Sequence, residues 1–175
     1  MENKVIDALV SRRSIRSYRP EQIRDEELEA ILKAGTYAAS GRNRQSAIMI
    51  AVQDAQTVAL LSKMNAEIMG SNIDPFYGAP TVIVVLADKT IPTHFEDGCL
   101  VMGNLMNAAY AVGVDSCWIH RAREEFESEE GKALLRKWGV ANAENYVGIG
   151  HCILGYRDCE YPAPIPRKEN YIYKV

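Results

Sequence analysis

The sequence predicts an α+β fold, α/β-like in its alternation, with a central mixed β-sheet flanked by helices. Short β-branched runs alternate with longer amphipathic segments along the 175 residues. No internal repeat divides the chain. Hydrophobic residues make up 47% of the composition, which is enough for one core. We therefore expect a single domain over residues 1–175 whose sheet is partly parallel.

The first half of the chain predicts three helices and one strand. Apolar residues at helical spacing indicate a short N-terminal helix. Asp25 and Asp54 are expected N-caps, because their carboxylates can accept hydrogen bonds from the free amides of a first turn. Gly70 is a suitable stop. The expected elements are helices over residues 3–11, 25–35 and 54–70, and a buried strand over 47–52.

The second half continues the alternation. The run Thr81–Ala87 is continuous and β-branched, as is typical of a strand covered on both faces. Ser128 is expected to cap the last helix. The expected elements are strands over residues 81–87, 114–119 and 146–154, and helices over 97–113 and 128–138.

The C-terminal segment, about residues 160–175, contains three prolines and cannot be helical throughout. It ends in Tyr171, Ile172, Tyr173 and Val175, residues that favour a strand. An extended arm of this kind gains stability by adding to the edge of another sheet. We expect an arm that is exchanged in a homodimer, in preference to one that docks on its own domain.

Charge and composition exclude several classes of protein. The 20 basic and 23 acidic residues give a net charge of -3, too close to balance for a nucleic-acid or membrane-surface partner. No export signal opens the chain, and the longest apolar run, Val82–Ala87, is too short to span a membrane. The histidines are far apart and the four cysteines form no C-x-x-C pair, so no metal site is expected. We predict a cytoplasmic protein with reduced thiols.

Two polar segments are candidate ligand sites. The segment 11–19 carries Arg12, Arg13, Arg16 and Arg19 with interspersed serines, and arginine forks match phosphate oxygens. The alternative is a solvated basic turn. The loop 40–46 presents both donors and acceptors, as a heterocycle requires, or is simply a polar surface loop. No glycine-rich dinucleotide motif or P-loop is present, so phosphate binding would depend on side chains.

The order of these features resembles the nitroreductase family of FMN-dependent oxidoreductases over nearly the whole chain. The segment 12–16 after a short helix resembles the flavin-phosphate segment of that family, and 39–45 resembles its Pro-Ser-x-x-Asn-x-Gln loop. Further matches, in order, are Phe76–Pro80 before a hydrophobic strand, Asp97 leading into a long helix, Gly113–Ile119, Gly148–Tyr156 and Pro166–Lys168.

The resemblance implies an interlocked homodimer with two FMN sites, each built from both chains. The phosphate and ribityl chain would be held by Arg12, Arg13, Ser14, Arg16, Arg167 and Lys168. The flavin ring would be contacted by Ser40, Asn43 and Gln45 and flanked by the backbone of Cys117, Trp118 and Ile119. Arg42 and Arg44 are additional charges in this loop, and would either favour an anionic substrate or face solvent.

The same resemblance implies that FMN itself carries the chemistry, so no catalytic protein residue is expected. NADH or NADPH would reduce the flavin by a ping-pong mechanism, and a flat, electron-poor small molecule such as a nitroaromatic or a quinone would reoxidise it. An alternative is a flavin-binding storage or sensor protein without turnover. A third hypothesis is a polyanion-binding module that uses the arginine cluster. The chain departs from the family where Ala39 replaces proline and Ser46-Ala47 replaces Pro-Trp.

Overall fold

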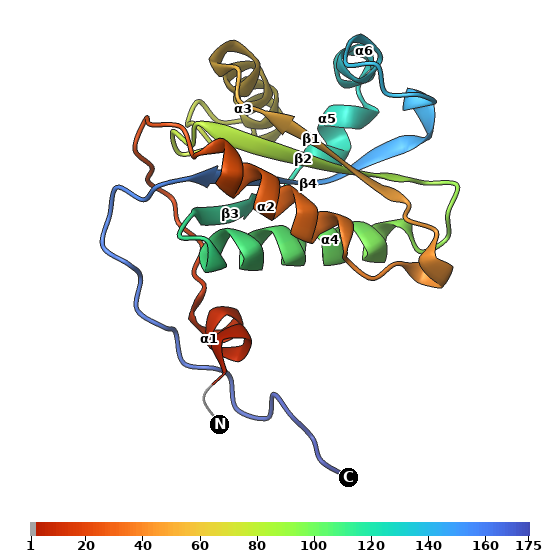
Figure 1. Ribbon diagram of the computed structural model, residues 1–175. Helices are drawn as coiled ribbons and strands as arrows, with labels where there is room; N and C mark the ends of the chain where they lie inside the picture. Colours follow the sequence, from red (N-terminus) through yellow and green to blue (C-terminus); the bar gives the residue numbers. More distant parts are fainter. Residues whose placement is uncertain (1–2) are drawn as a thin grey trace.

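The computed structural model describes residues 3–175, and these form one four-stranded sheet with helices on both faces (Figure 1). The strands are β1 (Ala47–Val52), β2 (Thr81–Asp88), β3 (Asp115–Ile119) and β4 (Tyr146–Gly155), and the helices are α1 (Lys4–Ser11), α2 (Asp25–Thr36), α3 (Ala55–Met69), α4 (His94–Ala111), α5 (Ala122–Glu127) and α6 (Glu129–Lys137). Two short 3-10 helices, η1 (Gly41–Asn43) and η2 (Ala143–Asn145), complete the order. The predicted α+β class is confirmed.

The sheet separates two apolar layers. On one side α2 and α4 pack Ile31, Met102 and Leu105 against β2. On the other side α3, α5 and α6 pack Leu61 and Phe126 against the same strand. Since β2 is covered on both faces, its continuous apolar sequence needs no alternation. Helix α1 lies off the sheet, next to the C-terminal end of α4 (Figure 1).

Local capping chemistry explains the helix ends that were predicted correctly. Asp54 accepts a 2.8 Å hydrogen bond from the amide of Thr57 at the start of α3, and the helix ends at Gly70 in the left-handed conformation. Ser128 accepts a 3.0 Å hydrogen bond from the amide of Gly131 and caps α6. In each case the signal is contained within a few residues of sequence.

Two helix predictions need correction, and one helix was not predicted. Arg24, not Asp25, is the N-cap of α2, because the Glu27 carboxylate reaches back to the Arg24 amide at 2.9 Å. Helix α4 begins at His94, so Asp97 lies within its first turn. The short helix α5 was not predicted, and it starts after Arg121, a non-glycine residue in the left-handed region.

The expectation of a partly parallel sheet is wrong for the four strands, because every neighbouring pair is antiparallel. Val52, at the end of β1, pairs with Val82 at the start of β2. Helix α3 and the loop 70–80 therefore make an outward and a return path, and the chain re-enters the sheet where it left. Strands β2 and β3 do run in the same direction, but β4 lies between them. Within residues 3–175 the parallel pairing is an isolated bridge between Ser14 and Ser116.

The C-terminal segment 157–175 is extended and exposed, and it runs beside α1 (Figure 1). One internal anchor is Tyr161, whose hydroxyl accepts a hydrogen bond from the Arg13 amide and donates one to the Ser11 carbonyl, both at 2.9 Å. Tyr171 and Ile172 are 66% and 76% exposed. The predicted terminal strand has no sheet partner among the described residues of this chain. Within residues 3–175 no helix combines the length and apolar character needed to cross a bilayer.

Candidate functional site at the two ends of helix α4

Residues 12–16 lie along the outer edge of β3. The amide of Ile15 donates a 3.1 Å hydrogen bond to the carbonyl of Ser116, and Ser14 forms a parallel bridge with the same residue. Ile15 is fully buried, and the buried Tyr18 donates a 2.8 Å hydrogen bond to its carbonyl. These contacts fix the backbone between the arginine side chains, so the basic segment is a rigid part of the fold.

Buried polar groups without hydrogen-bond partners gather at this edge. Within residues 3–175 they include Nη1 of Arg12, Nε of Arg13 and Oγ of Ser116. The other three belong to Glu125 and His151 in the opposite layer, whose Oε2 and Nε2 atoms lie 3.0 Å apart. A buried donor without a partner costs about 1–3 kcal/mol, so groups of this kind indicate a missing ligand. The groups at the β3 edge are suited to an anion.

Arg13 differs from its neighbours. Its Nη1 donates hydrogen bonds of 2.8–2.9 Å to the carbonyls of Val10, Ser11 and Arg12, and so satisfies the C-terminal end of α1. Arg16 is exposed and has no side-chain partner among the described residues. The structure therefore gives Arg13 a structural contact and leaves Arg12 and Arg16 available.

The loop 40–46 lies at the other end of α4 and has a constrained backbone. Ser40 accepts a 3.1 Å hydrogen bond from the amide of Gln45, and the Gln45 side chain donates one of 3.2 Å to Asn43. Arg42, Asn43 and Gln45 all have positive φ angles, between 49° and 54°. Strained non-glycine residues of this kind persist only where surrounding contacts hold them, and they concentrate at functional sites.

Asp97 supplies those contacts from the first turn of α4. Its carboxylate accepts hydrogen bonds from the amide of Gly41 at 2.8 Å and from the hydroxyls of Ser46 and Thr93 at 2.6 and 3.2 Å. Burial opposes ionisation of this carboxyl, but the three hydrogen bonds outweigh it and hold its pKa below the ordinary value. The charged form of Asp97 therefore holds the loop in place.

The remaining predicted contacts lie on β3 and in the tail. Cys117 and Ile119 are buried, and the half-buried Trp118 packs against Gly150, where a Cβ atom would lie 2.3 Å from the indole nitrogen. This close approach is possible only because residue 150 is a glycine. Arg167 and Lys168 are exposed in the tail, and within residues 3–175 Lys168 contacts only the ring of Tyr171, 5.2 Å from its centroid.

The predicted residues thus form two groups that one chain does not bring together. Residues 12–16 lie near the C-terminal end of α4, and the loop 40–46 lies at its N-terminal end (Figure 1). Helix α4 has 18 residues, a length of about 27 Å at 1.5 Å per residue. A single ligand in contact with both groups would need the second group from another chain.

The model of the nitroreductase family matches residues 9–156. The chain belongs to this family. A curated relative from Archaeoglobus fulgidus, named as a candidate NADH dehydrogenase/NAD(P)H nitroreductase, is 33% identical over 153 residues, which cover 85% of this chain and 82% of the relative.

Two solved nitroreductases show how closely the fold is shared. The structure of a Bacteroides fragilis nitroreductase with bound FMN superposes with a TM-score of 0.90 at 27% identity, over 99% of this chain and 100% of the other. An FMN-dependent nitroreductase from Clostridium difficile gives a TM-score of 0.82 at 25% identity, over 100% and 99% of the two chains. The predicted family and fold are therefore confirmed.

Several residues that shape this candidate site were assigned no contact in the sequence analysis. Ser116 pairs with the basic segment, Tyr161 ties the tail to it, and Asp97 holds the loop 40–46. Asp97 carries a sequence signal, because an acid in the first turn of a mostly apolar helix is a candidate for local hydrogen bonding. Ser116 and Tyr161 carry none, since their partners are about 100 or more residues away in sequence.

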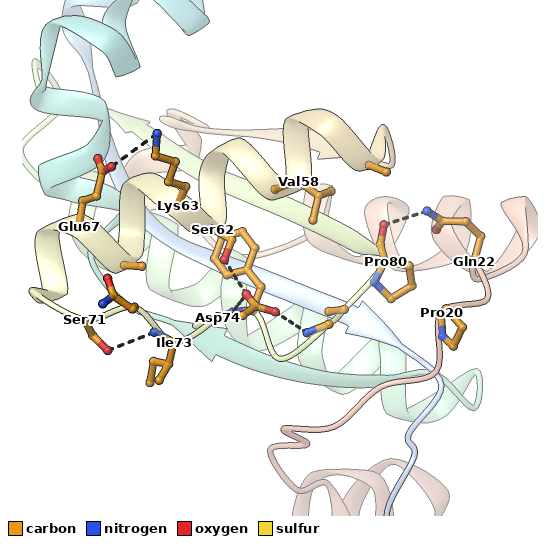
Figure 2. Close-up of a pocket in the computed structure, with 17 residues that line it drawn as sticks. Pro20, Gln22, Val58, Ser62, Lys63, Glu67, Ser71, Ile73, Asp74 and Pro80 are labelled. Atoms are coloured by element: carbon orange, nitrogen blue, oxygen red, sulfur yellow. Dashed lines mark hydrogen bonds and ion pairs between the residues drawn. The ribbon is translucent and has the colours of Figure 1, made fainter.

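A separate cavity of about 700 Å³ lies between α3 and the loop 71–80, and none of the predicted flavin contacts lines it (Figure 2). Asp74 shapes it by accepting hydrogen bonds from the hydroxyl of Ser62 and the amide of Phe76, and Lys63 pairs with Glu67 at its rim. Burial raises the pKa of the Cys99 thiol and raises that of the Cys152 thiol to about 12, so both thiols are neutral.

Proposed function

We propose that this chain is an FMN-dependent NAD(P)H oxidoreductase that works as a homodimer. The Bacteroides fragilis relative contains bound FMN, and the relative from Clostridium difficile is named as FMN-dependent. The Archaeoglobus fulgidus relative is named for NAD(P)H. From the names of these relatives we infer the class of cofactor and of reductant. Whether FMN fits this chain depends on its own residues.

The distribution of arginines without internal partners supports the binding of FMN. Of the twelve arginines, Arg13, Arg19, Arg24, Arg121, Arg123, Arg136 and Arg157 have internal side-chain partners. Within residues 3–175 the others, Arg12, Arg16, Arg42, Arg44 and Arg167, have none. These five all belong to the three segments in which the flavin site was predicted. Within residues 3–175 the arginines without partners are therefore confined to these three segments, a distribution suited to a phosphate-bearing cofactor.

The proposed contacts follow from this distribution. Arg12, Ser14 and Arg16 would hold the phosphate and ribityl chain, joined by Arg167 and Lys168 from the tail. Arg13 would contribute mainly by holding α1 and the backbone of this segment in place. The ring would be contacted by Ser40, Asn43 and Gln45 and flanked by the backbone of Cys117, Trp118 and Ile119.

The separation of the two groups along α4 supports the proposed homodimer. In a two-fold dimer that packs α4 against its copy in the antiparallel sense, the N-terminal end of one helix lies beside the C-terminal end of the other. The loop 40–46 of the second copy would then approach residues 12–16 of the first. Val5, Leu9 and Val10 on α1 are 50–68% exposed in the single chain, which supports an interface on this side.

Bound FMN would supply the redox chemistry, by which reducing equivalents would pass from NADH or NADPH to a second substrate. We expect the two substrates to use the same open face in turn, which gives ping-pong kinetics. Flat, electron-poor acceptors such as nitroaromatics and quinones fit a site that binds by stacking. The protein residues hold and orient these molecules, and none is required as an acid or base.

The test is the visible spectrum of the purified protein, recorded anaerobically before and after NADH or NADPH, with the released chromophore identified after denaturation. An FMN spectrum that bleaches supports the proposed oxidoreductase. An FMN spectrum that does not bleach favours the storage or sensor hypothesis. A colourless protein that cannot be reconstituted with FMN contradicts both.

A further inference from the structure

We propose that Arg42 and Arg44 form an anion-binding subsite at the mouth of the flavin site, so that the enzyme favours substrates carrying a phosphate or carboxylate group. This inference rests on the proposed flavin function and adds a substrate class to it. Both side chains are exposed, and neither has a hydrogen bond or an ion pair with any residue in 3–175. By contrast, five other arginines within residues 3–175 pair with a carboxylate.

The loop 40–46 lies between two hollows, and different residues of the loop line each one. A hollow of about 140 Å³ is lined by Ser40 and Gln45 together with residues of α2 and α4. A second hollow, of about 260 Å³, is lined by Gly41, Arg42, Arg44, Ile91, Pro92 and Thr93. Arg42 and Arg44 therefore line the same depression, and its wall is largely apolar. A planar ligand with an anionic substituent matches that combination, because its ring can pack on Ile91 and Pro92 while the forks bind the anion.

The loop backbone is held rigidly enough to position this pair. Gly41 is fixed by its 2.8 Å hydrogen bond to Asp97, and a Cβ atom there would lie 2.3 Å from the Thr93 hydroxyl oxygen. Arg42 itself is held at a φ of 53°. If the two arginines served only for solubility, no strained backbone would be required at Arg42.

The anion could belong to either substrate. The 2′-phosphate distinguishes NADPH from NADH, and a carboxylate distinguishes 4-nitrobenzoate from the neutral 4-nitrobenzamide, which has a similar shape. Both anions use the same charge-assisted contacts, so the chemistry of the subsite is the same. Since these contacts lie away from the reacting atoms, their loss should raise KM more than it lowers kcat.

The experiment compares FMN-loaded wild type with the double variant Arg42→Gln and Arg44→Gln. The control is Arg123→Gln, an exposed arginine on α5 that pairs with Glu127. The kcat/KM is measured for both acceptors with both reductants, and the affinity of the oxidised protein for 4-nitrobenzoate and NADP⁺ is measured from the change in flavin absorbance. We expect the double variant, and not the control, to lose about tenfold in one preference and in the matching affinity.

Each outcome has a defined meaning. Loss of the preference for 4-nitrobenzoate assigns the subsite to the acceptor, and loss of the preference for NADPH assigns it to the reductant. Unchanged ratios and affinities in a flavin-loaded, active double variant overturn the anion subsite and leave the proposed function standing. A wild-type protein that holds no flavin overturns the proposed function, and the subsite that rests on it.

Discussion

The carboxylate of Asp97 accepts a 2.6 Å hydrogen bond from the buried hydroxyl of Ser46, and this contact joins the first turn of α4 to the end of the loop 40–46. The two residues are 51 positions apart in sequence. The same carboxylate holds the Gly41 amide, so one charged group fixes both ends of the strained segment.

We expect Asp97→Asn to lower the free energy of unfolding by about 1–3 kcal/mol and to weaken FMN binding, because an amide cannot accept all three hydrogen bonds. Asp54→Asn is a matched control, since asparagine caps a helix as well as aspartate does. Urea unfolding followed by circular dichroism measures the first effect. Equal midpoints for the two variants would contradict the role given to Asp97.

The same residue predicts a dependence on pH. The pKa of Asp97 is lower in the folded state than in the unfolded chain, where it is about 3.9. Its contribution to stability is therefore fully present above about pH 5 and is lost as the pH falls through the folded value. The difference in unfolding free energy between wild type and Asp97→Asn should shrink below about pH 4. A difference that grows in acid would refute this assignment.

Arg12→Ala should weaken FMN retention, because it removes a half-buried guanidinium whose buried Nη1 atom has no internal partner among residues 3–175. The expected loss is about 1.5–3 kcal/mol, or about 10- to 150-fold in Kd. Arg19→Ala is the control, since Arg19 is exposed in the same basic segment and pairs with Glu21. Flavin fluorescence quenching gives both constants, and an unchanged Kd for Arg12→Ala would remove that residue from the site.

Two defective variants should complement each other if each site is shared. In a mixed dimer of Arg12→Ala and Asn43→Ala chains, one site receives both substitutions and the other receives neither. Unfolding and refolding an equal mixture should restore about a quarter of the wild-type activity, because half of the dimers are mixed and each has one intact site. If the mixture is no more active than the average of the two variants, both groups contact the flavin from one chain.

Deletion of residues 160–175 should yield a monomer without flavin. It removes the tail arm, the basic pair at 167 and 168, and the Tyr161 hydroxyl that binds the Arg13 amide. A shorter deletion of 170–175 keeps Tyr161 and the basic pair, and should weaken the dimer while flavin can still bind. Light scattering and absorbance measure both properties. A 160–175 deletion that stays dimeric and yellow would be incompatible with the exchanged arm.

Glu125→Ala should destabilise the fold by about 3 kcal/mol, because the fully buried Glu125 carboxylate pairs with His151 at 3.0 Å and accepts a 2.6 Å hydrogen bond from Asn65. Glu124→Ala, at the exposed neighbouring position, should change stability by less than about 0.5 kcal/mol. Thermal unfolding compares the two. Similar melting temperatures would show that the buried pair contributes little to the fold.

The predictions made from sequence succeeded where the deciding contacts are local. The ends of α3 follow from Asp54 and Gly70, which act within one helical turn. The start of α2 was misplaced by one residue because the choice depends on how Glu27 folds back on Arg24. The direction of β2 depends on the path of the loop 70–80, and no periodicity encodes whether a connection returns to its starting point.

The candidate site divides in the same way. The basic segment and the polar loop were recognised from composition, since the charge of arginines and the donors and acceptors of amide side chains follow from residue type alone. Their separation along α4 was not predictable. The two segments are closer to each other in sequence than either is to its spatial neighbours, Ser116 for the first and Asp97 for the second. Which arginines are left without partners also depends on contacts that only the folded chain defines.

In the proposed dimer, the division of the candidate site between the two ends of α4 would link cofactor binding to assembly by mass action. If FMN binds only where two chains meet, each bound flavin stabilises the dimer, and each dissociation of the dimer releases flavin. The apparent affinity for FMN then rises with protein concentration, and the specific activity of a dilute sample falls unless free FMN is added. Flavin supply would therefore set the fraction of chains that are assembled as well as the fraction that are active.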